Sequence, residues 1–399
     1  MIPRRTLTLY PGIVRDVLRY VLGRDGPASD RVARFEAAFA RYLGVRHAVA
    51  TASGTDAMLL LLDGLGLRPG DHLLTASYTI RPLIPALAAK GYDVELLDVA
   101  VDDCNVSVDD LRAKLRPDTR AVIVTHMFGT PARMDEIREA LAGRSCFLIE
   151  DAAHAHGATY KGRRCGTLGD AAFFSFDQVK PLSTFGGGMA VTDRDDLAAA
   201  VRAEVERDPV PADRHAKILA GFAEHALVNS PLFWLVTWLM RSDRVRRLLG
   251  TLYRALDHRP ATHNRRLSAV QAFIGLRQLD HLDARVAARQ RIARRLSAGL
   301  RRVAPQRVPE GCASSYYKFT ALAPGDSAPI KERMFRRGID VGIKDDINFP
   351  CHLDLGQTPA AFPGTTAVHE RLVELPGYES LKPREVERIA RALAEIENE

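Results

Sequence analysis

The chain has 399 residues, of which 46% are hydrophobic and 26% are charged, and its formal net charge is +7. This composition is ordinary for a globular protein, and the length suits one large domain with a smaller one. No segment approaches the roughly 20 consecutive apolar residues that cross a bilayer, and no apolar stretch follows the first five residues. The sequence therefore argues against a membrane-spanning helix and gives no indication of a signal peptide.

Charge and cysteine spacing limit the classes of partner. The basic residues are not interleaved with aromatic residues as in nucleic-acid-binding modules, so no nucleic-acid partner is expected. An arginine-rich but otherwise ordinary surface is the favoured interpretation of the positive charge, which could also attract a phosphorylated substrate or an anionic membrane. The cysteines form no CxxC pair, which disfavours a disulfide framework or a zinc site and favours the cytoplasm. They are Cys104, Cys146, Cys165, Cys312 and Cys351.

Hydrophobic periodicity predicts helices and strands in alternation through the first half of the chain. A helix over 30–43 carries its apolar residues on one face and ends at Gly44. Such alternation predicts a mostly parallel sheet covered by helices on both faces. The further strands are predicted over 47–51, 72–75, 94–99, 121–125, 146–150 and 188–192, and the further helices over 56–65, 80–90, 108–115, 133–142 and 193–205.

The pattern changes after about residue 206. Helical periodicity dominates to about residue 300, short strands and helices mix from Ser314 onward, and a helix is predicted over 383–396. We therefore predict a large α/β domain over residues 1–255 and a smaller α+β domain over 256–399.

Three features could meet at the carboxyl ends of the strands, where open parallel sheets bind ligands. The turn Ser53-Gly54-Thr55 lies between a predicted strand and a predicted helix, where backbone N–H groups and the helix dipole favour a phosphate. An N-cap without any ligand would produce the same pattern. Asp151 directly follows an apolar strand, where a buried carboxylate needs a cation such as a protonated pyridine nitrogen. A solvated loop aspartate is the alternative.

The third feature is Lys180, which stands between the apolar stretch 171–176 and the glycine run 186–188. Partial burial would lower its pKa and favour the free amine that bonds an aldehyde. A solvent-exposed lysine whose stem covers apolar surface is the alternative. His154 and His156 could also suggest a metal pair, but no third ligand is placed by the sequence, and no metal is expected.

In this order, the segments resemble the DegT/StrS family of sugar aminotransferases, which are pyridoxal-phosphate (PLP) enzymes of the aspartate-aminotransferase fold. The similarity extends from about Arg31 to the C-terminal helix. The segments that carry it are 52–57, 125–129, 134–135, 150–158, 166–171 and 174–176, followed by Lys180, Asn264, Arg266, Gln271, Gly275 and Gln278.

The resemblance implies a role for each matching residue. Lys180 would bond PLP and carry a proton, Asp151 would hold the pyridine nitrogen, and His154 would lie beside the ring oxygen. These three are the expected catalytic residues. The other expected cofactor contacts are Ser53, Gly54, Thr55, Tyr78, Ser175 and Asn264. Asn264 would reach the phosphate of a neighbouring subunit, since family members are homodimers with sites at the interface.

The chain also departs from the family pattern. Ile80 stands where many members have an aromatic residue that stacks on the cofactor, so Tyr78 or an aliphatic face would take that role. Gly186 stands where members often have an acid, and Asn348–His352 lies where relatives contact substrate. The expected reaction is transfer of an amino group from an amino acid, with glutamate as the expected donor, to a keto-sugar linked to a nucleotide.

Other functions remain open from the sequence. The ketone could be a cyclitol, a lipid-linked sugar or another natural product. A PLP-dependent dehydratase and a non-catalytic PLP-binding regulator are further alternatives. Relatives that run a dehydration replace the lysine by histidine, so Lys180 favours amino transfer.

Residues 231–256 are the most unusual segment, because they hold both tryptophans, Trp234 and Trp238, followed by five arginines. Tryptophan, leucine and arginine in this arrangement are typical of an amphipathic helix at a membrane surface. A helix buried in a dimer interface is the favoured alternative. The segment thus predicts either a subunit contact or a peripheral contact with the inner face of a membrane.

Overall fold

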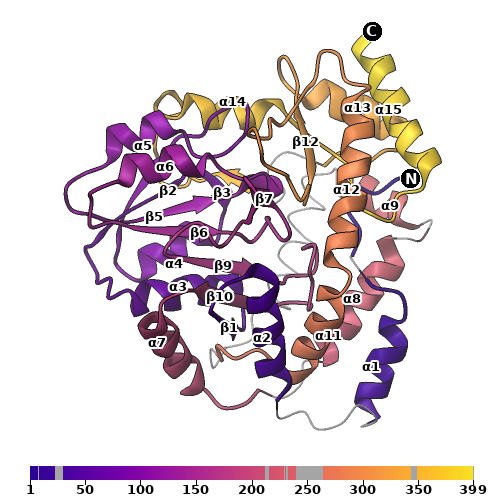
Figure 1. Ribbon diagram of the computed structural model, residues 1–399. Coiled ribbons are helices and arrows are strands. Elements are labelled where there is room, and N and C mark those ends of the chain that lie inside the picture. The colour runs from indigo at the N-terminus through magenta and orange to yellow at the C-terminus, as the bar shows by residue number, and fades with distance from the viewer. Residues whose placement is uncertain are drawn as a thin grey trace.

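A seven-stranded sheet forms the centre of the molecule in the computed structural model, which describes residues 1–7, 9–22, 30–211, 215–228, 230, 232–239, 264–342 and 348–398 (Figure 1). Its strand order is β1-β10-β9-β6-β5-β2-β4. Only β10 runs against the other six strands, so the prediction of a mostly parallel sheet is confirmed. The strands are β1 (His47–Thr51), β2 (His72–Ala76), β4 (Asp93–Leu97), β5 (Thr119–Thr125), β6 (Phe147–Asp151), β9 (Ala171–Ser175) and β10 (Gly188–Thr192).

Helices cover both faces of this sheet, as the alternating pattern predicts. One face buries Ala121, Ile123 and Ile149 against α3 (Gly54–Gly64), α4 (Leu83–Ala89) and α7 (Asp195–Glu206). The opposite face buries the alternate strand residues. There the helices are α5 (Val108–Lys114), α6 (Met134–Leu141), α2 (Arg31–Leu43), α11 (Ala269–Leu279) and α12 (Leu282–Ser297). Side chains therefore alternate between two apolar layers along each strand.

A second core surrounds a small antiparallel sheet of β11 (Ala304–Pro305), β12 (Phe319–Leu322) and β14 (Leu372–Leu375). The core clusters change along α12, because Val286 packs with the large sheet while Ala293 and Leu296 pack with the small one. Ile2 also joins the second core and bridges to Ile339. The helices here are α13 (Ala328–Arg336) and α15 (Pro383–Asn398), with α14 (Pro363–Arg371) between them in sequence. The predicted division near residue 255 lies outside the described residues and stays a prediction.

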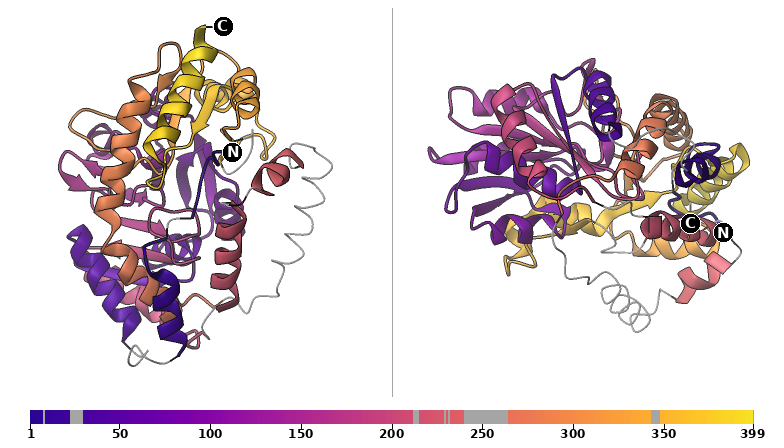
Figure 2. Two further views of the ribbon diagram at one scale, coloured as in Figure 1. Left: turned by 90° about the vertical axis from the view of Figure 1, so that its right-hand side faces the viewer. Right: turned by 90° about the horizontal axis from the view of Figure 1, so that it is seen from below.

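A pair of short strands, two 3₁₀ turns and three helices complete the architecture. The strands β7 (Thr159–Tyr160) and β8 (Arg163–Arg164) form an antiparallel pair. The 3₁₀ turns are η1 (Met127–Gly129) and η2 (Pro359–Ala361). Helices α1 (Ile13–Val21), α8 (His215–Val228) and α9 (Leu232–Leu239) lie on one side of the molecule, as Figure 2 shows.

The predicted helix over 80–90 is wrong at its start. Residues Tyr78–Ile80 form a strand, β3, which pairs with β13 (Asn348–Pro350) from the far end of the chain. The helix α4 begins only at Leu83, after Pro82. Local periodicity cannot reveal a pairing between segments so distant in sequence. The antiparallel direction of β10 and the helix α1 were also not expected.

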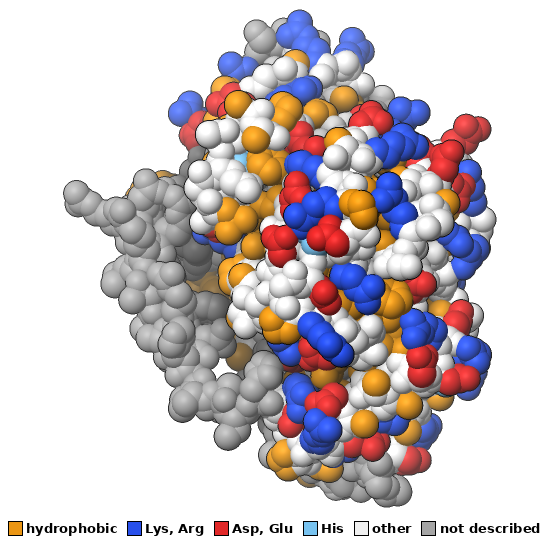
Figure 3. All heavy atoms as spheres, turned by 90° about the vertical axis from the view of Figure 1, so that its left-hand side faces the viewer, with side chains coloured by type: hydrophobic (Ala, Val, Ile, Leu, Met, Phe, Trp, Pro, Cys, Tyr) orange, Lys and Arg blue, Asp and Glu red, His pale blue; other side chains and the backbone are white. Residues whose placement is uncertain are grey.

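Basic and acidic side chains are interspersed on the face drawn in Figure 3. On α5, Arg112 lies 3.7 Å from Glu139 of α6, and Lys114 lies 2.9 Å from Asp110. An exposed pair such as Arg112 and Glu139 contributes little stability, typically about 0–1 kcal/mol. On this face the basic side chains are therefore mixed with acidic ones rather than gathered in one basic stripe.

The close approach of α11 to α2 depends on a glycine. A Cβ atom at Gly275 would lie 2.5 Å from the ring of Phe35, which is fully buried in the core. We predict that Gly275→Ala lowers the free energy of unfolding by about 1–3 kcal/mol, because the helices must separate. The measurement is urea denaturation followed by circular dichroism.

Gly299→Ala is the matched control, since its Cβ would meet no atom closer than 3.6 Å. That substitution is expected to change stability by less than about 1 kcal/mol. Equal loss in both variants would mean that helix contact at Gly275 is not the constraint.

Candidate active site

Asp151 lies at the carboxyl edge of the large sheet. Strand register places it beside Thr125 of β5 and Phe173 of β9. Its side chain accepts hydrogen bonds from the Thr125 hydroxyl and from the backbone N–H of Ala153, each at 3.1 Å. Burial raises the pKa of this carboxyl, while Ala153 and the charge of Lys180 oppose the rise. A further cation beside Asp151 would therefore stabilise its ionised form.

Lys180 is 7% exposed and follows β9 by five residues. Burial lowers the pKa of its amine from 10.5 to about 8, with Asp151 and Asp177 acting in the opposite direction. The amine lies 4.8 Å from the ring centroid of Tyr317. A lysine with this pKa has a substantial fraction of nucleophilic free amine near neutral pH.

The loop that follows Lys180 is held by polar side chains of α11. Gln271 donates to the carbonyls of Thr184 and Gly186 at 3.3 and 3.1 Å, and Gln278 donates to Ser183 at 3.1 Å. Gly186 has a φ of 118°, a conformation that residues with a Cβ rarely adopt. This turn therefore favours glycine at residue 186.

The predicted phosphate turn forms the N-terminus of α3. Ser53 caps the helix by accepting from the N–H of Asp56 at 3.1 Å, and its hydroxyl donates to the Asp56 carboxylate at 2.6 Å. A Cβ at Gly54 would lie 3.0 Å from the Cβ of Ser175, so these two residues are in direct contact. N–H groups in the first helical turn lack partners within the helix, and the dipole adds positive potential. Gly54, half-buried Thr55 and Ser175 thus form one small polar cradle.

His154 is buried in a stack of rings. Its imidazole lies 4.5 Å from the ring of Tyr317 and 6.4 Å from that of Phe128. Burial and the charges of Lys180 and Lys318 hold the pKa of His154 well below its usual value, so the ring is neutral. Its Nδ1 accepts the N–H of Phe128 at 3.4 Å, which leaves the ring proton on Nε2. His154 can therefore donate one hydrogen bond.

The two candidate stacking residues occupy different environments. Tyr78 is 3% exposed, and its ring meets the edge of Phe128 at 6.3 Å. Ile80 is half-buried and packs against the core under α3 and α4. The chain thus links Tyr78, Phe128 and His154 through successive ring contacts, and the role of Tyr78 at the cofactor stays a prediction.

Asn264 lies in the segment that runs beside the phosphate turn. Its amide donates to the carbonyl of Pro209 at 2.8 Å and accepts the N–H of Arg266 at 2.9 Å. The next carbonyl, that of Arg265, accepts the N–H of Ala52 at 2.8 Å. The expected contact of Asn264 with a neighbouring subunit stays a prediction.

Glu150 supports the strand end from the opposite face of the sheet. Burial alone would raise the pKa of the Glu150 carboxyl. His126 and the N–H groups of Gly166 and Gly169 outweigh burial and lower this pKa. His126 donates to it at 2.8 Å, and the two glycine N–H groups donate at 2.7 Å. These contacts fix the position of β6 and hence of Asp151.

The donor set fits pyridoxal phosphate. Lys180 can bond its aldehyde, the raised pKa of Asp151 calls for a cation such as a pyridinium, and the cradle at Gly54 and Ser175 admits a phosphate because a Cβ would crowd it. When bound, this cofactor supplies an electron sink for the carbon that carries the amino group. Among the described residues, no group of three His, Cys, Asp or Glu side chains is placed to hold a metal ion.

Comparison with known proteins agrees with this geometry. The sequence matches the DegT/DnrJ/EryC1/StrS aminotransferase family over residues 14–394. It is 30% identical over 377 residues to a dTDP-3-amino-3,4,6-trideoxy-alpha-D-glucose transaminase of Micromonospora megalomicea subsp. nigra, covering 92% of this chain and 89% of the relative. It is 33% identical over 261 residues to a GDP-perosamine synthase of Caulobacter vibrioides, covering 65% and 59% of the two chains.

A solved structure is also similar. The aminotransferase TlmJ from Streptoalloteichus hindustanus superposes with a TM-score of 0.77 at 26% identity, covering 99% of this chain and 98% of that one. Fold and site together define a pyridoxal-phosphate enzyme with an aspartate-aminotransferase-like fold. The chain belongs to the DegT/DnrJ/EryC1/StrS family and is an aminotransferase.

Sequence reasoning missed several residues at the site. Tyr317 and Lys318 approach Lys180 from the start of β12, and Thr125 binds Asp151 directly. Thr125 had a usable indication, since it ends the strand beside the one that ends at Asp151. Tyr317 had none, because the contact joins segments more than a hundred residues apart.

The lowered pKa of Lys180 predicts a pH dependence. Covalent attachment of pyridoxal phosphate to the cofactor-free protein needs the free amine, so its rate should rise with pH and level off above about 8. Each unit below that value should cut the rate about tenfold. The absorbance of the bound cofactor, followed by stopped flow, measures this profile.

Asp151→Asn provides the comparison, because it removes a negative charge that raises the pKa of Lys180. The profile of this variant should move to lower pH. A midpoint near 10.5 in the unaltered protein would show that burial does not act on this amine.

Proposed function

We propose that this aminotransferase moves an amino group from an amino acid, with glutamate as donor, to a keto-sugar carried on a nucleotide. The observation that carries the proposal is the buried pair of Lys180 and Asp151 beside the cradle at Gly54 and Ser175. The sugar substrate is supported by the names of the two sequence relatives, which act on dTDP- and GDP-linked sugars.

The chain's own residues divide the work. Lys180, with a pKa near 8, can accept a proton from the substrate carbon and return it elsewhere. Asp151, fixed by Thr125 and Ala153, would keep the pyridine nitrogen protonated. Neutral His154 would donate through Nε2 to the ring oxygen. Gly54, Thr55 and Ser175 would hold the phosphate at the N-terminus of α3.

The half-reaction with glutamate tests the chemistry. The bound cofactor should convert from its aldehyde form to its amine form when glutamate is added, as seen in the absorbance spectrum. Lys180→Ala should abolish the conversion yet retain cofactor through the phosphate cradle. Asp151→Asn should slow it by at least a hundredfold, on the scale of a lost general acid–base or electrostatic contribution.

A protein that binds the cofactor but never converts it with any amino donor would be a sensor and not a transaminase. Unchanged turnover in Asp151→Asn would mean that another residue holds the pyridine nitrogen. A mass-spectrometric screen of nucleotide-linked keto-sugars against cyclitol and lipid-linked ketones would then identify the acceptor. Water elimination in place of amination would instead indicate a dehydratase.

We further propose that the enzyme is a cytoplasmic homodimer and that α9 contributes to a subunit contact. Helix α9 exposes Leu232, Leu235, Trp238 and Leu239, an apolar surface that a monomer rarely presents. All five cysteines are free, which agrees with a reducing compartment. No helix among the described residues is long and apolar enough to cross a membrane. Most of the 231–256 segment, with its arginines, lies outside the described residues.

Light scattering after size exclusion tests the subunit contact. Leu235→Glu combined with Trp238→Glu should shift the dimer toward monomer, because charges would be buried at the contact. Leu355→Glu, at another site that is 48% exposed, is the matched control and should remain dimeric. A dimer unaffected by the α9 changes, together with flotation on anionic vesicles that those changes abolish, would assign α9 to a membrane surface instead.

A further inference from the structure

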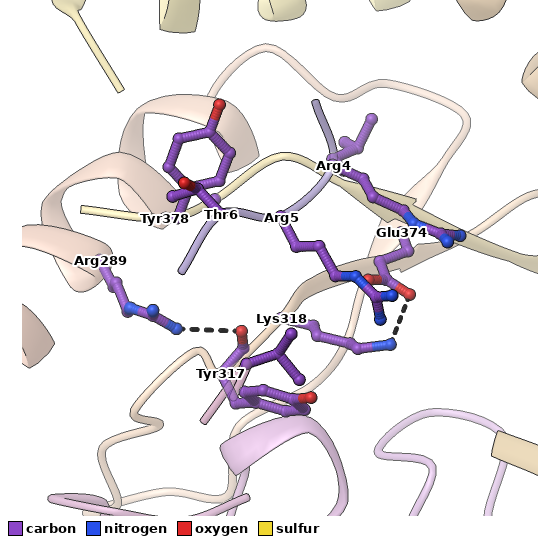
Figure 4. A pocket seen from close by; sticks show the side chains of 11 residues that line it. Arg4, Arg5, Thr6, Arg289, Tyr317, Lys318, Glu374 and Tyr378 are labelled. Carbon is purple, nitrogen blue, oxygen red and sulfur yellow. Dashed lines mark hydrogen bonds and ion pairs between the residues drawn. The ribbon is translucent and has the colours of Figure 1, made fainter. Parts of the chain in front are cut away.

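A second buried lysine lies beside the amine of Lys180. Lys318 is 9% exposed and stands directly before β12. Its amine lies 2.7 Å from the carboxylate of Glu374 on β14. Figure 4 shows the Lys318 side chain running beside the ring of Tyr317 toward Glu374, with Arg5 pointing to the same carboxylate. A charged pair is thus enclosed at the edge of the small sheet that faces the active site.

The two lysine amines share one aromatic neighbour. The Lys180 amine lies 4.8 Å from the centroid of the Tyr317 ring, and the Lys318 amine lies 5.8 Å from the same centroid. Tyr317 is itself held in place, because its carbonyl accepts a hydrogen bond from Arg289 at 3.0 Å. The amines are therefore close enough, in a buried environment, for the charge of one to act on the other.

Lys318 also contacts the ring stack that holds His154. The His154 ring stacks with Tyr317 at 4.5 Å and with Phe128 at 6.4 Å. The Lys318 amine lies 5.9 Å from the Phe128 centroid, and its backbone N–H donates to the Phe128 carbonyl at 3.4 Å. The positive charge of Lys318 is thus fixed against both of the rings that stack with His154.

The charges that act on Lys180 come from three parts of the fold. Asp151 at the end of β6 and Asp177 in the loop after β9 raise the pKa of the amine. Lys318 acts in the opposite direction and adds to the lowering by burial. Tyr317 and His154 stay uncharged near neutral pH, because burial raises the pKa of the phenol and lowers that of the imidazole. Lys318 is therefore a cation set against two acids.

A purely structural role would explain the pair less well. The strands β12 and β14 are already joined by backbone pairing from Phe319 opposite Leu375 to Leu322 opposite Leu372, and they share an apolar core. A buried ion pair seldom stabilises a fold more than apolar side chains of similar size would, since both charges lose their hydration. What the pair does supply is a positive charge in a fixed place.

We propose that Lys318, anchored by Glu374, is a positioning residue of the active site whose fixed positive charge keeps the Lys180 amine free of its extra proton near neutral pH. The inference rests on the proposed role of Lys180. A free amine can bond the aldehyde of the cofactor and accept a proton, whereas an ammonium group can do neither. Because Asp151 and Asp177 favour the ammonium form, a cation beside the shared ring counters them.

Selective labelling of Lys180 in the cofactor-free chain gives the first test. Short pulses of acetic anhydride at a series of pH values modify only free amines, and mass spectrometry of the peptide with Lys180 gives the midpoint. The midpoint should lie at about 8 in the unaltered protein. Lys318→Met should raise it by about 0.5–1 pH unit, the size expected for one charge acting across a buried ring. Lys318→Arg keeps the charge and should keep the unaltered midpoint.

Lys114→Met is the matched control. Lys114 also lies 2.9 Å from a carboxylate, that of Asp110, and 4.7 Å from a ring centroid, that of Phe362, but it belongs to α5. Its loss should not move the midpoint of Lys180. If Lys318→Met fails to fold because Glu374 is left buried without its cation, Lys318→Met combined with Glu374→Gln removes both charges. The double variant should show the same rise, because Lys318 is the member of the pair that acts on Lys180.

The cofactor-loaded enzyme gives the second test. The pH at which the absorbance of the bound cofactor changes should rise in Lys318→Met and return in Lys318→Arg. An unchanged labelling midpoint in the double variant would overturn the proposal, as would an equal rise in Lys318→Arg. If the midpoint moves as expected but no amino donor converts the cofactor, the charge effect stands and the proposed amino transfer fails. Conversion by glutamate without any shift would leave amino transfer standing and remove the role of Lys318.

Discussion

The site depends on the burial of one carboxylate and one amine at the same edge of a sheet. Removing either charge from water is costly, so burial raises the pKa of Asp151 and lowers the pKa of Lys180. The charge of each group partly opposes the shift of the other. The parallel register of β5, β6 and β9 brings them together, with Thr125 opposite Asp151 and the lysine loop following β9. A cofactor with a positive ring and an aldehyde would relieve both costs at once, which supports the proposal that these two residues hold it.

The neighbouring carboxylate on β6 has its hydrogen-bond partners within the protein. Glu150, one residue before Asp151, points to the opposite face of the sheet and receives hydrogen bonds from His126 and from the turn at Gly166–Gly169. Alternation of side chains along a strand makes this arrangement possible. The Glu150 carboxylate on one face of β6 is thus fully hydrogen-bonded within the protein. The Asp151 carboxylate on the other face is available to a ligand. Neutral His154 and Tyr317 add a stacked wall without adding charge.

Much of this arrangement can be predicted from sequence, and the limits have physical causes. Periodicity gives β1 at the residues observed and α2 within one residue, because both bury one regular face. The order of the phosphate turn, Asp151 and Lys180 identifies the chemistry, since strand ends of one parallel sheet meet at one edge. The strand at Tyr78–Ile80 escaped prediction because its partner begins at Asn348. Tyr317 and Lys318 escaped prediction for the same reason, because only tertiary contacts bring them to Lys180.

The grip of α11 on the loop after Lys180 has a mechanical consequence. Gln271 and Gln278 lie two turns apart on one face of a rigid helix, and together they fix three successive stretches of backbone at Ser183, Thr184 and Gly186. The backbone over residues 183–186 is therefore held in place and is not expected to move with the Lys180 side chain. In the proposed reaction, movement of the Lys180 amine would come from rotation about the four carbon–carbon bonds of its side chain, so the length of that side chain would limit where a proton can be delivered.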